Sequence, residues 1–152
     1  MTQRLNPYKA APAEIAAMRA LEDHVQASGL DYSLVELVKT RASQINGCAF
    51  CLHMHTTDAR KAGETEERLH LLAAWREAPV YTDRERAALG WCEALTRLST
   101  GHPSDADYAE LTRHFSEEEA VKLTLLIVAI NGWNRIAVGF GAQPAAATSK
   151  AA

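Results

Sequence analysis

Residues 36–55, ELVKTRASQINGCAFCLHMH, contain two of the three cysteines and two of the six histidines of the chain. The Asn46-Gly47 pair is a strong turn signal, so we expect one helix to end before it and the next to begin at or near Cys48. A helix turns by about 100° per residue, which puts Cys51 about 60° and His55 about 20° from Cys48 around the helix axis. These three side chains therefore share one helix face.

That shared face is suited to thiol chemistry. A thiolate near a helix N-terminus is stabilised by the unpaired N–H groups and the positive end of the helix dipole. His55, one turn after Cys51, can accept its proton or pair with the thiolate. Two cysteines three residues apart can also close into a disulfide, so one can attack and the other resolve. His53 lies about 140° from Cys48 and is expected to point elsewhere.

Glu36 belongs to the preceding helix and has two competing interpretations. Its carboxylate could relay protons to Cys48 or orient His55. Alternatively, Ser33 and Glu36 have the spacing of a capping box, which would need no catalysis. A carboxylate turned back to the helix cap cannot also serve the cysteines, and the spacing to the cysteines favours the relay.

Four positions resemble the signature of the AhpD-like alkylhydroperoxidase family, part of the carboxymuconolactone decarboxylase superfamily: Glu36, then Cys48, Cys51 and His55. The stretches 81–89 (YTDRERAAL) and 131–135 (NGWNR) are also similar to single-domain members of that family. The resemblance extends roughly over residues 5–140. The family pattern often has a histidine between the two cysteines, where this chain has Phe50.

The resemblance implies a thiol-dependent peroxidase that reduces an organic hydroperoxide. Cys51 would attack the peroxide, and Cys48 would resolve the sulfenic acid to a Cys48–Cys51 disulfide. His55 would be the base for Cys51, and Glu36 a member of the proton relay. A dithiol donor, such as a lipoyl domain or a thioredoxin-like protein, would then reduce the disulfide. No other cofactor and no metal is expected.

The resemblance also implies an oligomer, a trimer or hexamer, in which helices of neighbouring subunits complete the pocket. Among the aromatic residues, Trp133 is the best candidate for a pocket wall, because the resemblance places its helix near the site. Tyr81 is a second candidate. Aromatic side chains in a helical protein are nevertheless more often core residues.

Three other functions are alternatives to a peroxidase. The two cysteines, His55 and Glu36 could supply four ligands to zinc, although the chain has no second CxxC motif. The thiols could instead serve a general disulfide reductase or a redox sensor. A non-redox lactone decarboxylase of the superfamily would generally lack the paired cysteines.

Length and composition suit one all-α domain of six or seven helices, over residues 1–141, with a disordered tail at 142–152. Every segment carries helical spacing and none alternates as a strand does. The expected helices cover residues 12–28, 31–45, 48–62, 65–75, 82–98, 104–114 and 116–140. Residues 1–11 are expected to be irregular. Cys92 has no partner at useful spacing and is expected to be a small core residue.

The net charge of −3 gives no basic field for nucleic acid and no polybasic patch for a membrane surface. The longest apolar run, residues 125–130, is far shorter than the roughly 20 residues that span a bilayer. Three cysteines do not form the framework of a secreted disulfide-rich domain. The N-terminus lacks the apolar core of a signal peptide. We therefore expect a soluble, cytoplasmic protein.

Overall fold

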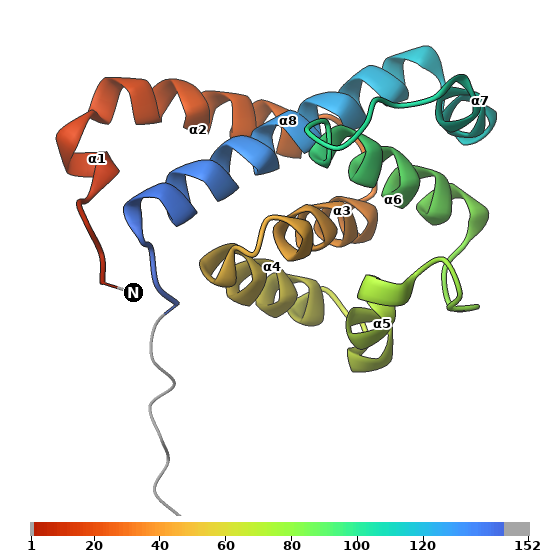
Figure 1. The fold of residues 1–152 in the computed structure, drawn as a ribbon, viewed down its shortest axis with the longest axis horizontal. Coiled ribbons are helices and arrows are strands. Elements are labelled where there is room, and N and C mark those ends of the chain that lie inside the picture. The colour runs from red at the N-terminus through yellow and green to blue at the C-terminus, as the bar shows by residue number, and fades with distance from the viewer. Residues whose placement is uncertain (1, 145–152) are drawn as a thin grey trace, which may run out of the picture.

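The computed structural model describes residues 2–144. Over these residues the chain forms helices and turns and no strand, which confirms the all-α prediction (Figure 1). Most of the predicted disordered tail, residues 142–152, lies outside the described residues. The elements are α1 (Pro7–Ala10), α2 (Pro12–Gln26), α3 (Tyr32–Ile45), α4 (Ala49–Lys61), α5 (Glu66–Leu71), the 3₁₀ turn η1 (Leu72–Ala74), α6 (Asp83–Thr96), α7 (Asp105–His114) and α8 (Glu117–Phe140).

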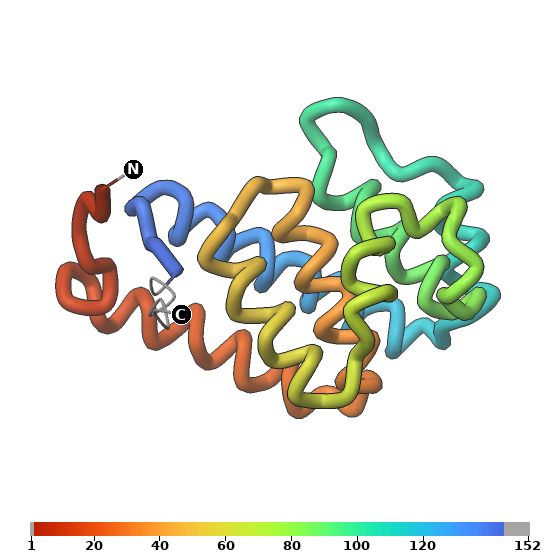
Figure 2. Tube along the Cα trace, turned by 90° about the horizontal axis from the view of Figure 1, so that it is seen from below, coloured from red at the N-terminus to blue at the C-terminus, as the bar shows by residue number. Residues whose placement is uncertain are grey.

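Helix α3 lies at the centre of the fold and packs against α4, α6 and α8 (Figures 1 and 2). Every residue from Leu34 to Ser43 is buried, whereas a surface helix buries only one stripe. The buried stretch includes charged side chains, Glu36 and Lys39 among them. Buried charges require partners, so the position of α3 forces its polar residues into defined contacts.

The main hydrophobic core joins α2, α3, α6, α7 and α8, and a second cluster lies between α3, η1 and α6. The core contains Val25, Leu34, Val35, Val38, Ala42, Ala87, Ala88, Cys92, Leu111, Phe115, Ala120, Leu123, Leu126, Ile127 and Ile130. The second cluster contains Leu37, Leu72, Trp75, Ala78, Tyr81 and Leu89. Cys92 is fully buried, as predicted.

The connection between α3 and α4 is a tight turn. Asn46 is still in the right-handed region, Gly47 has φ +64°, and Cys48 is extended and becomes the N-cap of α4. A left-handed residue at this point suits glycine, which has no Cβ to clash. The turn therefore returns α4 alongside α3 and places Cys48 at the start of α4, as the Asn46-Gly47 pair predicted.

Three sequence-based expectations about the helices are wrong in detail. Residues 1–11 are not wholly irregular, because Asn6 caps the short helix α1 through its side chain. The helix expected over 65–75 is divided into α5 and the 3₁₀ turn η1. The helix expected over 82–98 already ends at Thr96, and Leu98 lies beyond it with 50% of its surface exposed.

Helix α8 is the longest helix, and it begins at the capping box formed by Ser116 and Glu119. It is long and apolar enough to cross a membrane, judged by length and composition alone. Its inner face lies in the main core. Its outer face leaves an exposed row of apolar side chains, which we call the α8 stripe: Val121, Leu125 and Val128.

Candidate active site

The two cysteines of the motif form a Cys48–Cys51 disulfide at the N-terminus of α4, with their Cα atoms 5.4 Å apart. The backbone N–H of Cys51 donates to Cys48 Sγ at 3.3 Å, so the sulfur occupies the position of a helix-capping acceptor. The backbone N–H of Cys48 donates to the carbonyl of Ser43 at 3.0 Å, which ties the turn to the end of α3. The chain is thus shown in its oxidised form.

The third residue of the shared face, His55, pairs with Glu36. Nδ1 of His55 lies 2.9 Å from Oε2 of Glu36, and both residues are buried. An ionised carboxylate can only accept, so with Glu36 ionised Nδ1 carries the proton and Nε2 is left to exchange one. The carboxylate therefore fixes the orientation of the imidazole.

This contact decides between the two interpretations of Glu36. The N-cap of α3 is Asp31, whose Oδ1 accepts from the N–H of Leu34 at 3.1 Å. Ser33 Oγ instead donates to Glu64 on the exposed surface. The capping-box interpretation of Ser33 and Glu36 is wrong, and Glu36 is free to face α4.

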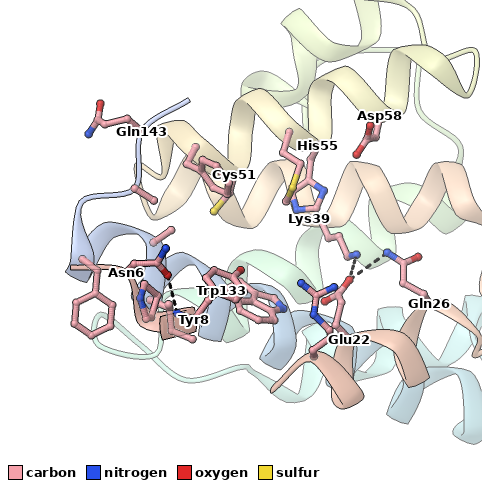
Figure 3. Close-up of a pocket in the computed structure, with 18 of the residues that line it drawn as sticks. Asn6, Tyr8, Glu22, Gln26, Lys39, Cys51, His55, Asp58, Trp133 and Gln143 are labelled. Atoms are coloured by element: carbon pink, nitrogen blue, oxygen red, sulfur yellow. Dashed lines mark hydrogen bonds and ion pairs between the residues drawn. The ribbon is translucent and has the colours of Figure 1, made fainter. Parts of the chain in front are cut away.

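Cys51 and His55 line a cavity of about 480 Å³ (Figure 3). Its walls come from α2, α3, α4, the end of α8 and the N-terminal segment. The apolar and aromatic part of the lining includes Leu5, Tyr8, Tyr32, Phe50, Met54, Trp133, Ile136 and Phe140. Cys48 does not line the cavity, so of the two sulfurs it is Cys51 that a ligand in this cavity can reach.

A partly buried ion pair closes another part of the cavity wall. Lys39, on α3 one turn after Glu36, is 1% exposed, and its ammonium group pairs with Oε1 of Glu22 on α2. Gln26 donates to the same oxygen at 3.1 Å. No role was predicted for Lys39 from the sequence. Its spacing of three from Glu36 was the available signal, because residues at that spacing share a helix face.

Tyr32 in the cavity wall has a perturbed phenol. Its pKa is raised, first by partial burial and then by the negative charges of Glu36 and Asp58. Burial alone disfavours the phenolate, and the two carboxylates act in the same direction.

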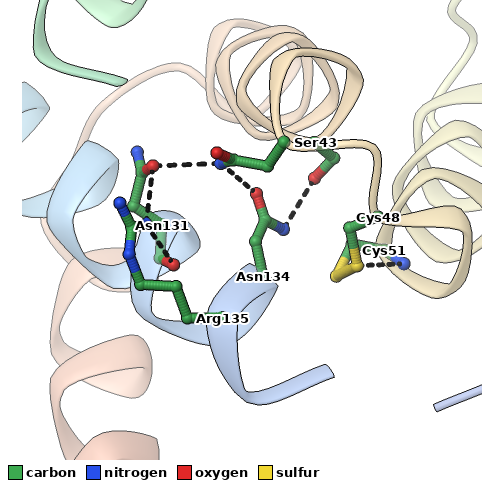
Figure 4. The surroundings of a disulfide bond; sticks show 7 residues. Ser43, Cys48, Cys51, Asn131, Asn134 and Arg135 are labelled. Atoms are coloured by element: carbon green, nitrogen blue, oxygen red, sulfur yellow. Dashed lines mark hydrogen bonds between the residues drawn. A yellow bond between two sulfur atoms is a disulfide. The ribbon is translucent and has the colours of Figure 1, made fainter. Parts of the chain in front are cut away.

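Side-chain amides hold the turn against α8 on the other side of the disulfide (Figure 4). Asn134 Nδ2 donates to Ser43 Oγ at 3.1 Å, and Asn46 Nδ2 donates to Asn134 Oδ1 at 2.8 Å. Asn46 also donates to Asn131 Oδ1 at 3.0 Å. This network supports the segment that carries Cys48. The contacts of the network were not predicted from the sequence.

The structure brings together most, but not all, of the candidate residues. Cys48 is bonded to Cys51, and His55 is paired with Glu36. The lining of one cavity includes Cys51, His55, Glu36 and Trp133.

Tyr81 does not belong to this cavity. It packs in the second hydrophobic cluster, and its hydroxyl donates to the carbonyl of Arg68. Its assignment to the pocket is therefore wrong. Its ring packs against residues of η1 and α6. The spacing of the cysteine motif carries no information about that packing. His53 is exposed, as its helix angle predicted.

Within residues 2–144, no group of three or more His, Cys, Asp and Glu side chains is arranged to hold a metal ion. The remaining cysteine, Cys92, is completely buried, and burial raises the pKa of its thiol to about 12.

Comparison with known proteins identifies the family. The family model for the carboxymuconolactone decarboxylase family matches residues 12–94. The uncharacterized protein YdfG of Bacillus subtilis is 42% identical over 145 residues, which cover 95% of this chain and 99% of YdfG.

Two solved structures are similar as well. One is a protein of unknown function from Agrobacterium tumefaciens for which a role in antioxidant defence as an AhpD has been proposed, with 49% identity and a TM-score of 0.92 over 94% of this chain and 98% of that one. The other is an uncharacterized peroxidase-related protein from a Silicibacter species, with 25% identity and a TM-score of 0.76 over 86% of this chain and 70% of that one. The chain therefore belongs to the carboxymuconolactone decarboxylase family, as an AhpD-like member.

Proposed function

We propose that this protein is a thiol-dependent peroxidase that reduces organic hydroperoxides through the Cys48–Cys51 pair. The observation that carries the proposal is that Cys51 faces a largely apolar cavity in which the His55–Glu36 pair is also present. An apolar cavity suits an organic substrate, and the pair supplies a group that can move a proton. A role in antioxidant defence has also been proposed for the related protein of Agrobacterium tumefaciens.

In the oxidative half of the reaction, His55 takes the proton of Cys51, and the thiolate attacks one oxygen of the hydroperoxide. An S–O bond forms and the O–O bond breaks, so Cys51 becomes a sulfenic acid. The leaving alkoxide takes the proton from His55 and departs as an alcohol. Glu36 keeps the imidazole oriented and stabilises its protonated form. Position three of α4 places Cys51 where the helix dipole also favours the thiolate.

The thiol of Cys48 then attacks the sulfenic sulfur, which forms the disulfide and releases water. An external dithiol reduces the disulfide through a mixed disulfide, and both cysteines regain their protons while the donor becomes oxidised. We propose a lipoyl group or a thioredoxin-like protein as the donor and the reducing cytoplasm as the location. No cofactor besides the cysteine pair takes part.

We also propose that the protein is a homo-oligomer, a trimer or hexamer. The α8 stripe supports this, because Val121, Leu125 and Val128 are exposed apolar side chains spaced four and three residues apart on one helix face. An apolar row of this kind gains stability when a second copy covers it.

The experiment that tests the proposed activity follows the loss of cumene hydroperoxide with dithiothreitol as the donor. Wild-type protein and Cys51→Ser are compared in this assay. Reduced Cys48→Ser is tested after the dithiothreitol has been removed, because dithiothreitol would itself reduce a sulfenic acid, and dimedone is present to trap that species. We expect turnover by the wild type, none by Cys51→Ser, and a single turnover by Cys48→Ser that ends in a dimedone adduct on Cys51.

Equal rates for Cys51→Ser and the wild type would contradict the assignment of the attacking thiol. Rapid reduction of a small disulfide, with no loss of hydroperoxide, would instead identify a general disulfide reductase.

A further inference from the structure

The cavity that contains Cys51 carries an excess of negative charge. Four carboxylates and two permanent cations line it, which leaves an excess of two negative charges with His55 neutral: Glu22, Asp23, Glu36 and Asp58 against Arg19 and Lys39. The Lys39–Glu22 ion pair sums to zero, and so do the charges of Arg19 and Asp23, which are both exposed. The excess therefore comes from Glu36 and Asp58.

Two of these carboxylates act on a residue of the cavity wall. Tyr32 lines the cavity, and the two carboxylates that act on its phenol are Glu36 and Asp58. Glu36 is 2% exposed, and a buried charge is screened by salt far less than an exposed one. Asp58 pairs with Lys61 at 3.0 Å, and the side chains are 39% and 72% exposed, respectively. Solvent therefore screens both this pair and the charge that Asp58 presents to the cavity, which makes Glu36 the stronger source of repulsion.

The Lys39–Glu22 pair also leaves hydrogen-bonding capacity unused. The ammonium group has three donors, and the acceptor found for it among the described residues is Glu22 Oε1. The second oxygen, Glu22 Oε2, is shielded from solvent and has no hydrogen-bond partner among the described residues. A buried donor beside a buried acceptor fits a ligand group that both accepts and donates, such as an amide or a hydroxyl. A carboxylate would bring no donor and would face the Glu22 oxygen with like charge.

We propose that this cavity selects uncharged ligands that carry a hydrogen-bonding group, an amide or a hydroxyl, and rejects carboxylates. Lys39 and Glu22 recognise the polar group, and Glu36 and Asp58 supply the repulsion. As a statement about substrates, this rests on the proposed function: neutral hydroperoxides and neutral thiol donors react at Cys51 faster than their carboxylated analogues. The charge selection itself exists whether or not the protein is a peroxidase.

The first test therefore uses alkylation, which needs no peroxide. Iodoacetamide carries a neutral amide where iodoacetate carries a negatively charged carboxylate. Each reacts with the Cys51 thiolate by forming an S–C bond while the C–I bond breaks and iodide leaves. Reduced Cys48→Ser protein leaves Cys51 as the one motif thiol, and serine retains a helix-capping oxygen. The ratio of the two rates in the folded protein is divided by the same ratio in urea, which removes the intrinsic difference between the reagents.

We expect the folded protein to disfavour iodoacetate by about tenfold at low ionic strength, with the factor falling as salt is added. In this background, Glu22→Gln leaves the Lys39 ammonium without its counter-charge, and Asp58→Asn removes one of the acids that act on Tyr32. Both changes should raise the iodoacetate rate relative to iodoacetamide. Glu77→Gln is the matched control, since it removes one negative charge from an exposed residue outside the cavity and should leave the ratio unchanged.

Three results would overturn the inference. One is equal ratios in the folded and urea-denatured protein, and another is a ratio that Glu77→Gln shifts as much as Asp58→Asn does. The third is a folded protein that iodoacetamide does not alkylate, because the cavity would then not admit even a neutral ligand. Asp58→Asn decides the matter if Glu22→Gln fails to fold.

A second comparison, between a neutral aryl hydroperoxide and its carboxylated analogue, extends the test to turnover. Charge selection in alkylation without any loss of hydroperoxide would contradict the proposed function and leave this inference standing.

Discussion

The contact between Glu36 and His55 leads to a prediction with a definite size. Glu36→Gln keeps the length of the side chain and its ability to hydrogen-bond Nδ1 of His55, but it removes the negative charge. In the wild type Oε2 of Glu36 lies 2.9 Å from Nδ1 of His55, and both side chains are almost completely buried. The protonated imidazole that accompanies the Cys51 thiolate would therefore lose its counter-charge.

A hydrogen bond to a charged group contributes about 1.5–3 kcal/mol, well below the bare Coulomb attraction because both groups also lose hydration. Each 1.4 kcal/mol corresponds to about a tenfold change in rate. If that energy supports the thiolate–imidazolium state, the bimolecular rate of reduced protein with a neutral organic hydroperoxide falls by about 10- to 150-fold in Glu36→Gln.

Stopped-flow tryptophan fluorescence measures this rate, since Trp133 lines the same cavity as Cys51. Glu93→Gln is the matched control. Glu93 is also buried, but its carboxylate accepts from Arg41 Nε and Trp75 Nε1, each at 2.9 Å, away from the cavity. The control should lower stability and leave the rate of the folded protein unchanged. A Glu36→Gln rate within threefold of the wild type, in a folded protein, would refute the role given to this pair.

Three further predictions concern stability and assembly. Asn134→Ala removes a buried amide that joins α8 to Ser43 and Asn46; we expect urea denaturation to show a loss of about 2–3 kcal/mol in the free energy of unfolding, and an unchanged midpoint would contradict this. The Cys92 thiol has a pKa raised by burial from 9.0 to about 12, so between these pH values the unfolded chain releases a proton that the folded chain keeps, and stability falls as pH rises. Cys92→Ala should reduce this slope, and an unchanged slope in denaturation curves from pH 8 to 10.5 would show that Cys92 does not contribute. Val128→Asp, in the α8 stripe, should reduce the oligomer mass seen by light scattering, while Leu98→Asp, at a comparably exposed site in the turn after α6, should not; equal masses for both variants would exclude the α8 stripe as the interface.

The sequence predicted those parts of the site that depend on local spacing. Cys48, Cys51 and His55 share a face because all three belong to one turn and one helix, whose geometry is the same in any protein. Glu36 could be placed near them because the Asn46-Gly47 turn is short. The all-α class followed from helical spacing along the whole chain.

The parts that depend on tertiary packing were not predictable in the same way. Lys39 on α3 and Glu22 on α2 are separated by 17 residues, and only the fold brings their side chains to the same cavity wall. Asn46, in the turn after α3, and Asn134, in α8, are separated by 88 residues. Tyr81 was misplaced for a related reason, since an aromatic side chain can fill either a core or a pocket wall and the sequence does not say which.

The N-cap of α3 shows a third kind of limit. Asp31 and Ser33 are both good capping residues. A helix capped by Ser33 would begin two residues later than one capped by Asp31. Helix boundaries are set by small energy differences of this kind. The choice of Asp31 nevertheless has a chemical consequence, because it leaves Glu36 available to His55.

The most direct test of the central claim is a thiol count on fully reduced protein before and after one equivalent of an organic hydroperoxide, with metal content measured on the same sample. Counting in denaturant after an acid quench includes the buried Cys92. We predict that the count falls from three thiols to one, that one equivalent of alcohol forms, that no metal is bound, and that a dithiol restores the lost thiols. A count that stays at three while the hydroperoxide persists, or a stoichiometric zinc ion held by the unreacted cysteines, would contradict the peroxidase account.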